Sequence, residues 1–156
     1  MKINWKLLIL CIVLPLAVGG AAALLTGGGI DVFEGVEQPP FAPPAWLFPA
    51  VWTILYTLMG ISSYLILVSG EGREEAANAL VVYVYQLFVN FLWPILFFNF
   101  RWFFVSFLWL LLLIFLVMIM IRRFYTISPG AAYMNIPYLL WLIFAGYLNF
   151  TIWWLN

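Results

Sequence analysis

Three side chains that can hydrogen-bond recur at helical spacing within one strongly apolar segment. Gln86, Asn90 and Trp93 lie at positions i, i+4 and i+7, so a helix would place all three on one face. Amides in apolar surroundings cost several kcal/mol unless they are hydrogen-bonded. We therefore expect this face to point into a helix bundle, where it either bonds helices together or contacts a ligand.

Aromatic residues in two other segments can complete a cavity. Trp52 and Tyr56 lie one turn apart on a helical face, and the small Ala145 leaves room beside Trp141 and Phe144 for a flat molecule. The alternative is that these rings simply pack in a core. We predict an apolar pocket in which N–H, O–H and amide groups orient a ligand. The predicted pocket residues are Trp46, Trp52, Tyr56, Asn90, Trp93, Trp141, Phe144 and Ala145.

Composition limits the chemistry available to such a pocket. The 156 residues include no His and a single Cys, Cys11, which excludes an intrachain disulfide and argues against a metal site or imidazole catalysis. Six basic residues balance six acidic residues, so no net charge would attract nucleic acid. The function must therefore rest on amides, hydroxyls and aromatic rings.

The elements that position these residues are predicted to be transmembrane helices. The chain is 67% hydrophobic and 8% charged, far from the roughly 45–50% apolar and 25% charged residues of soluble domains. A helix needs about 20 apolar residues to cross a bilayer. Five segments qualify, which predicts an all-α membrane protein with a single five-helix domain over residues 1–156. The predicted spans are 7–26, 46–68, 79–98, 102–121 and 132–154, with a kink at Pro94.

The basic residues predict the orientation of this bundle. With a cytoplasmic N-terminus and an outside C-terminus, five of the six basic residues face the cytoplasm and only Arg101 faces outward. The cytoplasmic group consists of Lys2, Lys6, Arg73, Arg122 and Arg123.

The first span has an alternative interpretation. Two lysines, an apolar run and the small residues of 19–23 also fit a cleavable signal peptide. The small residues Ala17, Gly20 and Ala21 equally suit a close contact between helices.

Residues 27–45 form a long first loop, rich in glycine and proline. Asp31, Glu34 and Glu37 lie in it without any Lys or Arg, which suits the outer face. A loop of this length is either a plain connector or a lid over the outer mouth of the pocket.

Ordered motifs over the last four spans resemble the translocator protein family, also called the tryptophan-rich sensory protein (TspO/MBR) or peripheral benzodiazepine receptor family. The motifs are Pro39-x-x-x-Pro43-Pro44-x-Trp46, Val51-Trp52-x-x-Leu55-Tyr56-x-x-Met59-Gly60, Gln86-x-x-x-Asn90-x-x-Trp93-Pro94 and Pro137-Tyr138-Leu139-x-Trp141. The resemblance implies a five-helix bundle, commonly a homodimer, with a pocket under the first loop.

The same resemblance implies ligands and site residues. Family members bind porphyrins such as protoporphyrin IX, as well as isoquinoline carboxamide and benzodiazepine drugs. Trp52, Asn90 and Trp141 match family pocket positions, the first two being those that hydrogen-bond drug carbonyls. The cholesterol motif of animal members needs a Tyr followed by Arg or Lys, but Thr151 and Trp154 occupy those positions. We therefore do not expect cholesterol as the natural ligand.

Three functions are compatible with these observations. The leading hypothesis is a receptor or sensor in a bacterial plasma membrane that binds metal-free porphyrin without any resident cofactor. The second is enzyme-like, light- and oxygen-dependent breakdown of protoporphyrin IX, with Trp52 and Trp141 as catalytic electron donors, so enzymatic activity is left open. The third is transport of tetrapyrroles or lipids, which is disfavoured because no buried charge offers coupling to ions.

Overall fold

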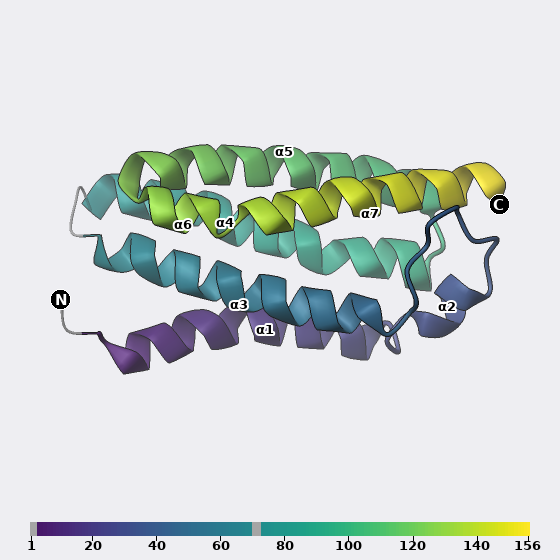
Figure 1. Cartoon of the computed structure of the whole chain (residues 1–156), viewed down its shortest axis with the longest axis horizontal. Helices are drawn as coiled ribbons and strands as arrows, with labels where there is room; N and C mark the ends of the chain where they lie inside the picture. Colours follow the sequence, from purple (N-terminus) through teal and green to yellow (C-terminus); the bar gives the residue numbers. More distant parts are fainter. Residues whose placement is uncertain (1–2, 70–72) are drawn as a thin grey trace.

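The computed structural model describes residues 3–69 and 73–156, and this part of the chain is built from helices without strands (Figure 1). Five segments are long and apolar enough to cross a membrane, which confirms the predicted all-α membrane fold. The long helices are α1 (Trp5–Leu25), α3 (Leu47–Val68), α4 (Arg73–Pro94), α5 (Phe103–Ile127) and α7 (Ile136–Leu155). Shorter helices are α2 (Ile30–Glu34), the π-helix η1 (Ile95–Asn99) and α6 (Pro129–Tyr133).

The long helices lie side by side along one axis and alternate in direction (Figure 1). α1 packs mainly against α3, whereas α5 lies between α4 and α7. An odd number of crossings places the two termini at opposite ends of the bundle. The end near the N-terminus also carries the link between α5 and α6, and the opposite end carries α2 and the link between η1 and α5.

Two helix boundaries differ most from those predicted, by six residues each. α4 begins at Arg73 rather than Ala79, and α5 continues to Ile127 rather than ending at Ile121. The polar residues at both positions are helical. In α5 the helix continues past Ile121 because no residue before Pro129 prevents helical hydrogen bonding. α5 ends at Ser128, which is extended and whose side chain caps α6 by accepting a bond from the Ala131 amide. Arg122 and Arg123 therefore lie on a helix and not in a loop.

Pro94 changes the type of helix. α4 ends at this residue and the chain continues as η1, in which the Phe100 amide bonds to the Ile95 carbonyl at 3.2 Å. Proline has no amide N–H, so the regular ladder is interrupted there. The predicted distortion thus takes the form of a wider π turn.

Glycines bring α1 and α3 into close contact. A Cβ atom built on Gly60 would lie 2.5 Å from the Cα atom of Ile12, and one on Gly19 would lie 2.2 Å from the Tyr56 ring. Ala17, Gly20 and Ala21 do not take part in this contact, because all three are exposed on α1. The contact needs a glycine on each helix, and a sequence pattern within one helix does not show which face meets its partner.

The first loop covers the end of the bundle that holds the C-terminus. Phe33 of α2 is buried in a cluster with Phe97 and Ile152. The Glu37 amide donates to the Asn156 side-chain oxygen at 2.9 Å, and the Tyr147 hydroxyl donates to the Pro40 carbonyl at 2.8 Å. Figure 1 shows this segment crossing α7 before it reaches α3.

Candidate functional site

A hydrogen-bonded chain of buried side chains joins three helices. The Tyr56 hydroxyl of α3 donates to Asn90 Oδ1 of α4 at 2.7 Å, and Asn90 Nδ2 donates to the Tyr138 hydroxyl of α7 at 2.7 Å. The Tyr138 hydroxyl donates in turn to Gln86 Oε1 at 2.8 Å. The prediction that both amides point into the bundle is confirmed, because all four side chains are buried.

Tyr138 is a central residue that the sequence reading did not select. It links both amides through one hydroxyl group. Its spacing carried a signal, since Tyr138, Trp141 and Ala145 lie at i, i+3 and i+7 on one face of α7. The consequence for Asn90 is direct: both ends of its amide already bond to tyrosines, so a ligand that binds Asn90 must compete with them.

Trp93 belongs to a second polar cluster. Its indole N–H donates to Asn149 Oδ1 at 3.1 Å, and its ring stacks on Phe97 with centroids 5.4 Å apart. The Ser106 hydroxyl donates to the same oxygen, and Asn149 Nδ2 donates to the Phe103 carbonyl. Trp93 therefore shares a helix face with Asn90 but uses its polar atom to bond α4 to α7.

Aromatic rings fill the space between α3 and α7. Trp52 stacks on Tyr56 with centroids 5.4 Å apart and meets the edge of Tyr138 at 6.1 Å. The ring centroids of Trp141 and Phe48 lie 5.9 Å apart. Phe48 was not among the predicted pocket residues. The backbones of α3 and α7 come close to each other at few positions, so side chains form most of the interface between these two helices.

A groove of about 430 Å³ opens along this interface. Its wall consists of Val51, Ile54 and Leu55 from α3 with Pro137, Leu140, Trp141 and Phe144 from α7. The volume lies within the range of roughly 300–1,000 Å³ that is usual for small-molecule sites.

The indole N–H of Trp141 is a donor without an acceptor. Its nitrogen is buried, and no hydrogen-bond partner for it lies within the described part of the chain. A buried donor without a partner costs about 1–3 kcal/mol. Because this nitrogen has no accessible surface, a ligand in the groove can supply the missing bond only when the side chains that cover it move aside.

The structure brings together most, but not all, of the predicted pocket residues. Trp141 and Phe144 line the groove, and Ala145 is buried on the same helix. Tyr56 and the partly buried Trp52 belong to the hydrophobic core that also contains Leu55 of the groove wall, and Asn90 bonds to Tyr56. Trp46 stands apart at the start of α3, where 67% of its surface is exposed.

This fold and this site define a class: a multi-pass helical membrane protein with a polar network in its core and an aromatic groove between two spans. The model of the TspO/MBR family matches residues 11–155, and the chain belongs to that family.

Curated relatives agree with this assignment. Proteins named tryptophan-rich protein TspO from Chlorobaculum tepidum and Archaeoglobus fulgidus are 36% and 37% identical over 150 residues. These alignments cover 96% of this chain and 95% and 96% of the two relatives. The translocator protein of Bos taurus is 37% identical over 128 residues, which is 81% of this chain and 76% of the bovine protein.

Proposed function

We propose that this protein is a membrane receptor or sensor that binds a flat tetrapyrrole, with protoporphyrin IX as the representative ligand, in the groove between α3 and α7. Isoquinoline carboxamide and benzodiazepine drugs, which are also flat and carry carbonyl acceptors, are expected at the same site. The observation that carries the proposal is the unsatisfied Trp141 N–H in an otherwise apolar wall.

The chemistry of the ligand suits this wall. A porphyrin offers an apolar face to the rings of Trp141 and Phe144, and its carboxylates offer the acceptor that the Trp141 N–H lacks. Trp52, Tyr56 and Asn90 then support the wall from behind. The sequence contains no His, so we expect metal-free porphyrin to bind more tightly than haem.

A titration of protoporphyrin IX into the purified protein, followed by quenching of Trp fluorescence, tests the proposal. Trp141→Phe keeps an aromatic ring but removes the donor, and we expect about tenfold weaker binding because hydrogen bonds to charged groups contribute about 1.5–3 kcal/mol. Trp102→Phe is the matched control, because Trp102 is 54% exposed at the start of α5 and stacks on Phe100. Equal losses in the two variants, or haem binding as tight as that of protoporphyrin, would contradict the proposal.

The enzymatic alternative uses the same groove. Trp52 stacks on Tyr56 beside it, and such a ring pair is an electron donor for an excited porphyrin that needs no acid or base. If light- and oxygen-dependent breakdown is the function, Trp52→Phe or Trp141→Phe abolishes breakdown under light while part of the binding is kept. Unchanged breakdown in both variants rejects a catalytic role for these residues. Transport is tested by porphyrin flux into liposomes that contain the protein.

The cellular setting is also a proposal. We place the protein in a bacterial plasma membrane, in keeping with the near full-length match to the protein from Chlorobaculum tepidum, and we expect a homodimer, as the resemblance of the motifs to the family implies. Cell fractionation and light scattering of the detergent-solubilised protein test the two statements separately.

A further inference from the structure

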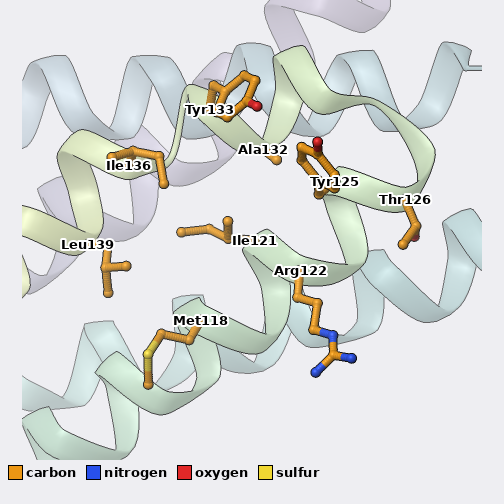
Figure 2. Close-up of a pocket in the computed structure, with 9 residues that line it drawn as sticks. All are labelled: Met118, Ile121, Arg122, Tyr125, Thr126, Ala132, Tyr133, Ile136 and Leu139. Carbon is orange, nitrogen blue, oxygen red and sulfur yellow. The ribbon is translucent and has the colours of Figure 1, made fainter.

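A second groove, which shares no lining residue with the first but lies on another face of the start of α7, is formed between α5 and the α6–α7 segment. Its volume is about 420 Å³. Met118, Ile121 and Leu139 make up its apolar part, and Arg122, Tyr125 and Tyr133 make up its polar part. Figure 2 shows Met118 and Leu139 on one side of the groove and Arg122 and Tyr125 on the other. The groove is therefore mainly apolar, with polar side chains at one side.

The two consecutive arginines of α5 have different surroundings. Arg123 Nη1 donates to the Asn78 carbonyl of α4 at 3.2 Å, whereas Arg122 lines the groove beside α7. Neighbouring residues of a helix point about 100° apart, so the two side chains serve different faces. Arg122 thus places a permanent positive charge at the polar part of the groove.

The shape of the groove favours a chain over a disc. Its α5 residues run from Met118 to Thr126, which is roughly 12 Å along the helix axis. Tyr125 and Tyr133 meet edge to face with centroids 5.9 Å apart, so they present no flat surface on which a macrocycle can stack. The groove lies on membrane-spanning helices and runs along them, as an acyl chain does in a bilayer.

We propose that this groove is a binding site for a phospholipid with an anionic headgroup. The acyl chain lies against Met118, Ile121 and Leu139, and the headgroup phosphate bonds to the exposed Arg122 guanidinium at the edge of the groove. The position within the fold agrees, because exposed Lys6 and Arg123 lie at the same end of the bundle. This site does not depend on the groove between α3 and α7.

Native mass spectrometry of the full chain in detergent, titrated with phosphatidylglycerol and with phosphatidylcholine of identical chains, tests the proposal. We expect phosphatidylglycerol to bind about fivefold more tightly, the effect of one basic residue near an anionic headgroup. Arg122→Gln removes this preference and Arg122→Lys retains it. Arg123→Gln, which changes the charge equally outside the groove, also retains it.

Further measurements distinguish a phospholipid from a free headgroup and from a porphyrin as the ligand of this groove. Leu139→Trp fills the apolar part and lowers the binding of both lipids, whereas glycerophosphoglycerol, which has the headgroup without chains, does not bind. Equal affinity for the two lipids, equal effects of the two Gln substitutions, or binding of the headgroup alone would overturn the proposal. Displacement of phosphatidylglycerol by protoporphyrin IX in wild type but not in Arg122→Gln would assign the groove to the porphyrin instead.

Discussion

At the scale of single residues, two buried polar groups have opposite roles. The amide of Asn90 is held at both ends by Tyr56 and Tyr138, so its bonds fix the packing of three helices. The N–H of Trp141 is held by nothing within the described residues. We infer that the first group is mainly structural in the unliganded protein and that the second is the group most ready to bond a ligand.

The central position of Tyr138 leads to a prediction about stability. Tyr138→Phe removes one hydroxyl that accepts from Asn90 and donates to Gln86, and it leaves both buried amides with a bond missing. The free energy of unfolding should fall by about 1–2 kcal/mol. Thermal unfolding in detergent measures the change, and Tyr85→Phe, at a residue 62% exposed on α4, is the control. Equal melting temperatures for Tyr138→Phe and wild type would show that the network contributes nothing.

The separate position of Trp46 leads to a prediction about binding. Trp46→Phe should change the affinity for protoporphyrin IX by less than about twofold, because 67% of this residue is exposed outside the groove. Trp141→Phe in the same titration provides the comparison. A loss as large as that of Trp141→Phe would restore Trp46 to the pocket.

At the scale of elements, the contact between α1 and α3 depends on glycine. The nearest neighbours of a Cβ at Gly60 are backbone atoms of Ile12 and Cys11, which cannot rotate away as a side chain can. α1 and α3 are therefore so close that only glycine fits at position 60. Gly19 of α1 likewise leaves the space that the ring of Tyr56 occupies.

Gly60→Ala should lower stability by about 1–3 kcal/mol, because the added methyl group forces α1 and α3 apart. Gly20→Ala is the matched control on α1, since nothing lies within 4 Å of its added Cβ, and it should be neutral or stabilising by up to about 1 kcal/mol. Thermal unfolding of both variants is the measurement. If the two variants melt together, the close contact does not exist in the membrane protein.

The first loop is anchored to the end of the bundle by a buried aromatic ring. Phe33 is 8% exposed and meets Phe48 edge to face at 4.9 Å, so one buried ring anchors the loop beside the start of α3. Loss of this anchor should release the loop without unfolding the bundle.

Hydrogen exchange tests this anchoring. Phe33→Ala should increase amide exchange in residues 30–42 by at least about tenfold, while exchange in α5 is unchanged, because removing a buried Phe costs several kcal/mol. Phe41→Ala lies in the same loop at a residue 89% exposed, and it should leave the exchange as in wild type. Faster exchange throughout the bundle would show that Phe33 supports the whole fold instead.

At the scale of the whole molecule, charge distribution predicts how the bundle lies in the membrane. Lys6, Arg122 and Arg123 lie at the end near the N-terminus, and the first loop with Asp31 and Glu34 lies at the other end. The positive-inside rule then places the N-terminus in the cytoplasm.

Cysteine labelling in intact cells measures this orientation. A membrane-impermeant maleimide should label Glu34→Cys but not Thr126→Cys, because these exposed residues lie at opposite ends of the bundle. Wild type supplies the background, since Cys11 is buried. The reverse labelling pattern would invert the topology.

The order of residues was sufficient to predict five apolar helices and to predict that Gln86 and Asn90 point into the bundle. Both conclusions follow from one physical fact: a bilayer cannot hydrogen-bond a backbone or an amide, so length and polarity leave no alternative. The same reasoning identified most residues around the groove, because helical spacing fixes which side chains share a face.

Which of those residues contact one another could be learned only from the packing of the helices. In the structure Asn90 bonds to Tyr138, and Trp93 bonds to Asn149. Trp46 is exposed outside the groove, and the N–H of Trp141 has no hydrogen-bond partner among the described residues. The structure also places Arg122 and Arg123 on a helix, with Arg122 in a second groove. These pairings depend on the rotation of each helix against its neighbours, and periodicity within one helix contains no information about that rotation.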